Sequence, residues 1–438
     1  MKTLKSVLGP VIFPALMVGL LLNGALPLLS QADMFTAYAD PPDDDGFDDD
    51  LDDDFDDDFE DALLSDDTFE SLISLDEIDA LDGFDNFTDN VGNFALSGEI
   101  LLFLDNADLA AISSRGYKIR SQEFLGGLDK NLVKIEPPVS YTIDQVKSDI
   151  QTFAPETQVD YNHIFRTESG DKRVRKSGHI PNVIFDPILP KSEAEIKIGM
   201  IDTALRSSHS VFDQASIVEK DFVSFDFKKP THGTSIASIL VGQSKDYTGL
   251  LPDATLYSAS VFFDAPLGQE SATTESLIQA INWLVENDVK IINMSLAGPA
   301  NDILEQTITE ATAKGVLIIA AVGNSGPSAK PLYPAAYENV VAVTAVDEKQ
   351  EIYRRANRGE HVDFAAPGVR IRNARGRKKF QTSTGTSYAT PFVAAIFASH
   401  VQTSAEAQTA LIERYRSTAT DLGEEGYDDT YGYGLIKP

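Results

Sequence analysis

Apolar and polar residues are distributed along this chain in three different ways. Residues 7–29 form a long, nearly continuous apolar run that follows Lys2 and Lys5. Residues 40–93 place isolated apolar side chains among many aspartates. From residue 98 onward, apolar runs of strand length alternate with amphipathic segments of helix length. We therefore expect the chain beyond residue 98 to fold into a mixture of helices and strands.

The alternation is most regular in residues 195–438. Four continuous apolar segments predict buried strands: 196–201, 291–295, 316–322 and 340–346. Residues 275–287 and 303–314 are helix candidates between them, the second ended by Gly315. This order favours one α/β domain, in which helices cover both faces of a parallel sheet.

Residues 98–166 show a shorter pattern of their own. Strands are expected at 99–104, 117–124, 132–135 and 157–164, and helices at 107–115 and 143–152. The order βαββαβ predicts a small α+β domain of the ferredoxin-like kind. Residues 167–194 contain several prolines and exposed basic residues, which indicates a linker.

Four polar residues stand where the predicted elements end or begin. Asp202 follows the strand 196–201, and Asn324 follows the strand 316–322. His232 precedes Gly233 and an apolar helical run. Ser387 precedes another such run, at a helix N-terminus where negative charge is stabilised. Taken singly, each suits a cap or a turn, but functional groups of open α/β sheets also gather at the carboxyl ends of strands.

The motifs around these residues resemble those of the subtilisin family, the subtilases. The resemblance is carried by MIDTA around Asp202, HGTS around His232 and GTSYATP around Ser387, in the order Asp, His, Ser. Shorter matches occur at 251–257, 291–298, 333–335, 365–368 and 431–434. The resemblance covers roughly residues 195–438 and implies a subtilisin-like α/β fold, with a parallel sheet flanked by helices on both faces.

The resemblance also implies roles for these residues in a serine endopeptidase that works through an acyl-enzyme. Ser387 is expected to attack the scissile carbonyl, His232 to move its proton, and Asp202 to orient the imidazole. Asn324 is expected to stabilise the oxyanion together with the backbone N–H of Ser387. An extended substrate would pair as an added strand with the substrate-binding residues Ser295, Leu296, Ala297 and Gly298.

Departures from the family pattern lead to two narrower expectations. Ala297 stands where the family often has glycine, and Leu332 lies near the expected base of the main specificity pocket. Both suggest a shallow pocket that disfavours a large aromatic residue before the cut. At residues 209–212 the chain lacks the aspartate of a common calcium site. We therefore expect no metal there and no required cofactor, although calcium elsewhere remains possible.

Residues 1–32 have the pattern of a signal peptide, with an uncleaved membrane anchor as the alternative. The expected location is therefore outside the cytoplasm, either secreted or periplasmic, or else anchored in the membrane by this segment. The chain has no cysteine, so it forms no disulfides, and its redox compartment stays undecided.

The chain carries a formal charge of −32, and most of it is local. Residues 40–93 hold 24 Asp and Glu and no Lys or Arg, so removing these charges would bring the total to −8. We expect residues 33–96 to be a disordered, low-complexity segment. A helix that forms only when the charge is neutralised is the alternative, since apolar residues recur at every fourth position from Phe47 to Leu63. This charge argues against binding to nucleic acid.

By position and pattern, residues 97–166 resemble the propeptide of subtilases, which acts as a folding aid and inhibitor; an unrelated α+β domain is the alternative. A maturation cut is expected within residues 162–190. The predicted function is that of an exported serine endopeptidase for protein or peptide substrates, made as a precursor inhibited by its own propeptide. A narrow or self-processing protease and a pseudoprotease that serves as a binding module are the alternatives.

Overall fold

The computed structural model describes residues 86–136, 141–167, 172–173, 178–181, 189, 195–223, 230–264, 270–400 and 404–438. The predicted signal peptide, most of the acidic segment and much of the predicted linker lie outside these residues. Within them, no helix combines the length and the hydropathy needed to cross a lipid bilayer.

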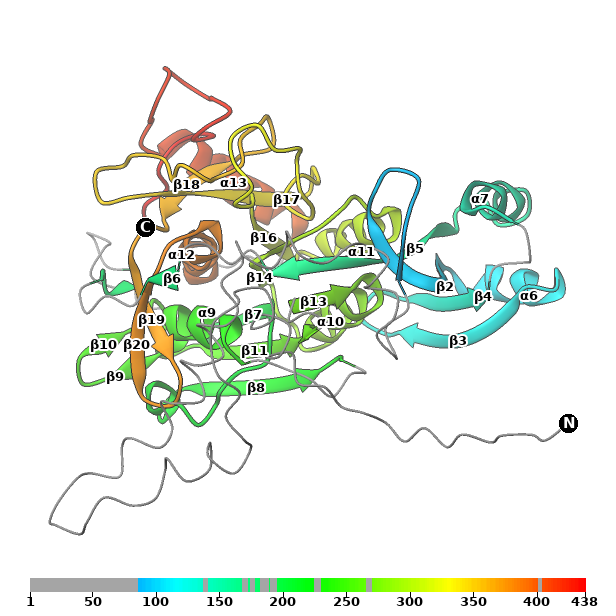
Figure 1. Cartoon of the computed structure of the whole chain (residues 1–438), viewed down its shortest axis with the longest axis horizontal. Helices are drawn as coiled ribbons and strands as arrows, with labels where there is room; N and C mark the ends of the chain where they lie inside the picture. The colour runs from blue at the N-terminus through cyan, green and yellow to red at the C-terminus, as the bar shows by residue number, and fades with distance from the viewer. Residues whose placement is uncertain are drawn as a thin grey trace, which may run out of the picture. The chain divides into compact units, whose positions relative to one another are not determined.

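A seven-stranded parallel sheet forms the centre of the C-terminal domain (Figure 1). In spatial order its strands are β18 (Phe364–Pro367), β17 (Val340–Val346), β16 (Leu317–Ala321), β14 (Ile291–Met294), β7 (Lys197–Asp202), β11 (Thr255–Ser260) and β8 (Ser216–Asp221). Every residue of β14, β16 and β17 is buried, as expected for strands covered on both faces. The predicted fold class is therefore confirmed.

Helices cover the two faces of this sheet in pairs. The helices α9 (His232–Val241) and α12 (Thr386–Ser399) share one hydrophobic core with Ile319. The helices α10 (Thr274–Glu286) and α11 (Asp302–Ala313) share a second core with Ile318. Consecutive residues of a strand point to opposite faces, so β16 contributes to both cores. The last helix, α13 (Ala405–Thr418), packs Leu411 and Tyr415 against the first core.

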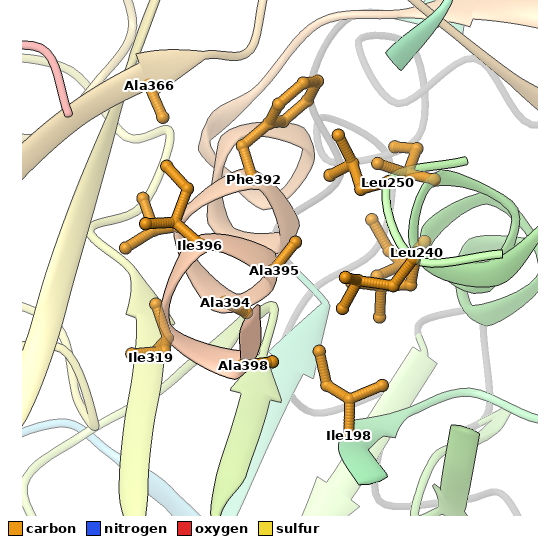
Figure 2. Close-up of a cluster of buried hydrophobic side chains, with 14 of the residues drawn as sticks. Ile198, Leu240, Leu250, Ile319, Ala366, Phe392, Ala394, Ala395, Ile396 and Ala398 are labelled. Atoms are coloured by element: carbon orange, nitrogen blue, oxygen red, sulfur yellow. The ribbon is translucent and has the colours of Figure 1, made fainter. Parts of the chain in front are cut away.

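Helix α12 is apolar on all sides and is buried from Thr386 to Ala398. Figure 2 shows it surrounded by Ile198 and Ile319 from the sheet and by Leu240 from α9. An apolar surface all round is characteristic of a helix inside a protein core. The position of the first turn of α12 is therefore fixed by packing along the whole helix.

The N-terminal domain has the predicted βαββαβ order. Its elements are β2 (Phe94–Leu104), α6 (Asn106–Ser114), β3 (Lys118–Leu125), β4 (Lys130–Glu136), α7 (Ile143–Gln151) and β5 (Gln158–Thr167). The antiparallel strands lie in the order β5-β2-β4-β3. One face of this sheet packs on the two helices through a core that includes Leu102, Ile112, Val133 and Ile150.

The N-terminal end of this domain differs from the prediction of disorder up to residue 96. Strand β1 (Asn86–Thr88) pairs with β2, and Asp89 accepts backbone N–H bonds from Val91 and Asn93 in the connecting turn. The ring of Phe87 lies 4.9 Å from that of Tyr161. For residues 86–96 the prediction was wrong, because these aromatic and turn contacts with the following domain outweigh the local acidity.

The N-terminal sheet also extends into the C-terminal domain in a way that the sequence did not indicate. Strand β5 pairs antiparallel with β13 (Glu270–Thr273) and with β15 (Leu296–Ala297), and β13 pairs with β12 (Phe263–Asp264). The sheet of the N-terminal domain therefore continues into strands of the C-terminal domain. The remaining short elements are β6 (Lys172–Arg173), η2 (Ser210–Phe212), β9 (Gln243–Ser244), β10 (Tyr247–Thr248), β19 (Ile371–Arg375) and β20 (Lys379–Ser383).

A conservative truncation tests the packing of α12. Ile396 is fully buried in the first core, so Ile396→Val should lower the free energy of unfolding by about 0.5–1.5 kcal/mol. The measurement is the midpoint of urea unfolding at unchanged slope. Val218→Ala, at a position that is 40% exposed, is the control and should change stability by less than about 0.5 kcal/mol. Equal effects at the two positions would contradict this account of the core.

Candidate active site

Asp202 and His232 form a buried hydrogen-bonded pair. Asp202 is the last residue of β7 and His232 the first of α9. The imidazole Nδ1 lies 2.8 Å from Asp202 Oδ1 and 3.0 Å from Oδ2, so the Nδ1–H donates to the carboxylate. Each residue is only 1% exposed. The pairing of the carboxylate with Nδ1 leaves Nε2 as the nitrogen that can exchange a proton at the site.

Thr203 fixes the geometry of this pair. Its backbone N–H donates to Asp202 Oδ1 at 2.7 Å, and its hydroxyl oxygen accepts the backbone N–H of Gly233 at 2.8 Å. A Cβ at position 233 would collide with the carbonyl oxygen of Thr203. Glycine is therefore required for α9 to approach the end of β7 this closely.

Ser387 is the second residue of α12 and is fully buried. Its backbone carbonyl accepts a hydrogen bond from the Ser295 hydroxyl at 3.1 Å, and its own Oγ lies 3.5 Å from the Ser295 carbonyl oxygen. The ring of the next residue, Tyr388, lies 5.9 Å from the His232 ring. The structure thus brings the start of α12 to the Asp202–His232 pair and to the end of β14.

Asn324 lies beside the first turn of α12. Its side-chain oxygen accepts the backbone N–H of Thr386 at 3.0 Å and the Thr386 hydroxyl at 3.2 Å. With Oδ1 held as the acceptor, Nδ2 is the donor end of this amide. The preceding Gly323 has φ +104°, a left-handed conformation that glycine adopts readily. The loop after β16 therefore presents a hydrogen-bond donor at a helix N-terminus.

The predicted substrate-binding residues lie along one strand edge. Gly298 exchanges backbone hydrogen bonds of 2.8 and 3.0 Å with Tyr333, so Leu332 is placed beside the strand. A Cβ at Gly323 would come within 2.8 Å of Leu332 Cδ1. The Leu332 side chain therefore lies against the loop that carries Asn324.

This strand edge is already paired, and its partner is the chain itself. Ala297 lies opposite Arg166 and Leu296 opposite Thr167 on β5, while Arg166, Phe165 and Ile164 pair with β13 on the other side. The ring of Phe165 is fully buried against Gly298, where any Cβ would collide with it. Strand β5 thus lies along the predicted substrate-binding residues.

Polar residues of β5 bind the N-termini of two helices of the C-terminal domain. Asp160 accepts the backbone N–H of Asp302 at 2.8 Å at the start of α11, and Asn162 accepts that of Glu275 at 3.0 Å near the start of α10. Both acceptors satisfy helix N–H groups that lack intrahelical partners. Burial raises the pKa of Asp160, while the nearby His163 and Lys147 act in the opposite direction.

His163 belongs to the same interface. Its Nε2 lies 3.3 Å from Asp89 Oδ2, and its Nδ1 lies 2.9 Å from the amide nitrogen of Asn301. Nothing local in the sequence connects this histidine with residue 301, so its role could not be predicted. Thr203 and Thr386 were missed as positioning residues as well, although each adjoins an expected site residue within a motif.

The stretch where a calcium ligand was expected to be missing forms the short helix η2. His209 Nδ1 accepts the backbone N–H of Val211 at 3.0 Å, and Nε2 lies 2.9 Å from the carbonyl oxygen of Lys379. Burial lowers the pKa of His209. Across the described part of the chain, no three acidic or histidine side chains cluster as a metal site would need. The expectation about metals stays a prediction.

A parallel sheet covered by helices on both faces in this order is the fold of subtilisin-like serine endopeptidases. A family model described as the subtilase family matches residues 193–434. The chain therefore belongs to the subtilase family.

Curated relatives agree with this assignment. The chain is 36% identical over 248 residues to the minor extracellular protease Epr of Bacillus subtilis (strain 168), covering 55% of this chain and 38% of that protein. It is 34% identical over 255 residues to subtilisin DY of Bacillus licheniformis, covering 56% of this chain and 89% of that protein. The chain thus matches less than half the length of Epr and most of subtilisin DY.

Two solved structures share the fold. Fervidolysin from Fervidobacterium pennivorans, a keratinolytic enzyme related to subtilisin, superposes with a TM-score of 0.62 at 18% identity, covering 78% of this chain and 60% of that chain. The epidermin leader peptide processing serine protease of Staphylococcus aureus superposes with a TM-score of 0.60 at 16% identity, covering 77% and 97%. Both matches cover more of this chain than the family model does.

Proposed function

We propose that this protein is a serine endopeptidase made as a self-inhibited precursor. The observation that carries the proposal is the position of β5. A strand of the N-terminal domain pairs with both β13 and β15, and its last described residue, Thr167, lies opposite Leu296. Leu296 directly follows Ser295, which contacts Ser387. The chain therefore binds its own segment as a protease binds an extended substrate.

The chemistry follows from the positions of the four polar residues. Ser387 Oγ attacks the scissile carbonyl, and His232 Nε2 takes its proton and then delivers it to the leaving amine. Asp202 holds the Nδ1–H and stabilises the imidazolium that forms. The oxyanion receives hydrogen bonds from Asn324 Nδ2 and the Ser387 backbone N–H, at a helix end where negative charge is favoured.

Substrate selection is proposed to rest on main-chain pairing together with a shallow pocket. Ala297 and Gly298 supply a strand edge, which binds the backbone of a peptide whatever its side chains. Leu332 extends towards Gly323 and reduces the depth available to the residue before the cut. Small or short side chains are therefore the preferred residues at that position.

The N-terminal domain is proposed to be the inhibitory propeptide. Strand β5 is paired on β15 as far as Thr167, and the chain is next described at Lys172, paired on β20. The maturation cut is therefore proposed to fall between Thr167 and Lys172, inside the wider window of residues 162–190. The end of β5 would then be a product that stays bound until the N-terminal domain leaves.

Export is proposed as well. Residues 1–32 have the sequence pattern of a signal peptide, and the relative Epr is named an extracellular protease. An inhibited precursor suits such a route, because an active endopeptidase would endanger other proteins before export.

Replacing the nucleophile tests the whole proposal. Ser387→Ala should leave the purified chain at full length and unlabelled by a fluorophosphonate probe, whereas the wild type shortens by a cut between Thr167 and Lys172 and becomes labelled. Intact mass and probe fluorescence are the measurements. Ser417→Ala, on the exposed face of α13, is the control and should behave as the wild type. A wild type that is neither cut nor labelled after removal of the N-terminal domain would favour the pseudoprotease alternative.

Asn324→Ala tests the oxyanion contact separately. Loss of one preorganised donor should lower kcat by about 10²–10³ with little change in KM, because the bond strengthens in the transition state. Steady-state kinetics on a peptide substrate provide the measurement. Asn339→Ala, at an exposed position near β17, should leave kcat unchanged. A rise in KM at constant kcat would instead assign Asn324 to ground-state binding.

Phe165→Ala tests the inhibitory strand. Truncation of this buried ring removes its contact with Gly298 and should weaken binding of the N-terminal domain, shortening the lag before activity appears. The lag is read from progress curves of the maturing precursor. Tyr141→Ala, at a residue 49% exposed in the same domain, is the matched control. Equal lags in the wild type and Phe165→Ala would contradict the inhibitory role of β5.

A further inference from the structure

The strands β19 and β20 form a hairpin whose charge is opposite to that of the chain as a whole. Residues 370–379 contain six Lys and Arg and no Asp or Glu, in a chain with a formal charge of −32. The two strands pair from Ile371 opposite Ser383 to Arg375 opposite Lys379. Arg377, Lys378 and Lys379 are exposed at its tip. We refer to residues 370–383 as the basic hairpin.

The basic hairpin is attached directly to the proposed catalytic elements. Strand β20 ends at Ser383, four residues before Ser387 on the same chain. Strand β19 lies against α9, where Ala374 accepts a hydrogen bond from the Ser235 hydroxyl at 3.2 Å and donates its N–H to the Ser238 hydroxyl at 2.9 Å. Figure 1 shows β19 and β20 beside α9 and β6. The position of the hairpin relative to the nucleophile is therefore fixed.

Residues 167 and 172–173 of the chain indicate which part of a substrate, before or after the scissile bond, contacts the hairpin. On the N-terminal side of the proposed cut, Thr167 is paired with Leu296 on β15. On the C-terminal side of the proposed cut, Lys172 is paired with Ser383 and Arg173 with Thr382 on β20. Only four residues separate Thr167 from Lys172. With the proposed cut between these two residues, the part of a polypeptide that follows the scissile bond pairs with β20.

In the register of this pairing, a longer substrate strand would extend along β20 towards the charged tip of the hairpin. A substrate strand that continued in the register of Lys172 and Arg173 would lie opposite Gln381, then Phe380, then Lys379. From Ser383 to Lys379 the path is about 13 Å, at roughly 3.3 Å for each residue. Acidic side chains on this stretch of a substrate would therefore come within reach of the exposed cations of the tip.

One cation is also held along the side of the hairpin. The guanidinium of Arg372 lies 4.5 Å from the centre of the Phe380 ring and 5.9 Å from that of Tyr247, and it donates to the Asp246 carbonyl at 3.1 Å. These contacts hold its positive charge beside β20 without neutralising it, because the ring faces and the carbonyl carry no formal charge.

We propose that the basic hairpin is a specificity site that binds acidic residues on the C-terminal side of the scissile bond. The substrates are polypeptides with several Asp or Glu in the stretch that follows the cut. This inference rests on the proposed protease function and adds a substrate class to it. Exposed ion pairs are individually weak, so several acting together should give about a tenfold preference at low salt.

The precursor's own sequence is a poor ligand for this site. Residues 172–176 read Lys-Arg-Val-Arg-Lys, so the charges that follow the proposed maturation cut have the same sign as the hairpin. Charges of the same sign repel one another. An acidic substrate therefore gains an advantage over the precursor segment that it must displace.

Three matched peptides test the proposal on the enzyme that forms by maturation of the full chain. The first has the natural sequence of residues 158–180, the second carries Glu at positions 172, 173, 175 and 176, and the third carries Ser at these positions. A short peptide that starts at residue 158 and ends two residues after the mapped maturation cut reports activity that the charged tip does not influence. At low salt the Glu peptide should exceed the natural one about tenfold in kcat/KM, and at about 0.5 M salt this ratio should fall towards one.

A charge-reversed hairpin completes the test. Arg377→Glu with Lys378→Glu should reverse the order of the peptides once rates are normalised to the short peptide. Lys314→Glu with Lys349→Glu makes the same change of charge at exposed positions outside the hairpin and should keep the wild-type order. The proposal is overturned if the wild type cuts all three peptides at equal rates, or if the reversed hairpin keeps the preference. Failure to cut even the short peptide would instead overturn the protease function itself.

Discussion

Burial of α12 in the core beneath the parallel sheet is the constraint on which the site depends. The helix is apolar on every side, so it has one stable position, between α9 and the strands β14, β16 and β17. That position sets the first turn, where Ser387 contacts Ser295 and Thr386 holds the Asn324 amide. The proposed nucleophile and the proposed oxyanion donor are therefore positioned by the same packing that stabilises the domain.

The Asp202–His232 pair depends on the same core from the other side. Strand β7 ends at the carboxylate and α9 begins at the imidazole, and both elements pack in the core that encloses α12. A buried carboxylate needs a compensating partner, and here the imidazole N–H and the Thr203 backbone supply it. Removal of either partner would thus affect folding as well as the proposed chemistry.

Much of this architecture could be predicted from the sequence, because its signals are local. Continuous apolar runs predicted β14, β16 and β17. The motif residues Asp202 and His232 lie directly at the end of β7 and the start of α9. The N-terminal domain was predicted from its alternation of short strands and helices. The pairing of β5 with β13 and β15 was not, since it joins residues more than 100 positions apart through backbone groups that every sequence possesses. The contact of His163 with Asn301 also joins distant residues and could not be predicted.

Loss of β5 with the N-terminal domain would increase the tendency of this protein to aggregate. While β5 is in place, both neighbouring strands have partners, but its removal would expose backbone groups of β13 and β15 together with the apolar surface that covers Phe165. Open strand edges of this kind pair readily with other chains and so promote aggregation. The uneven charge matters here, because it is concentrated in residues 40–93, upstream of the proposed cut. Maturation would remove this acidic segment, and with it most of the electrostatic repulsion between molecules. The loss would coincide with the exposure of the unpaired edges of β13 and β15.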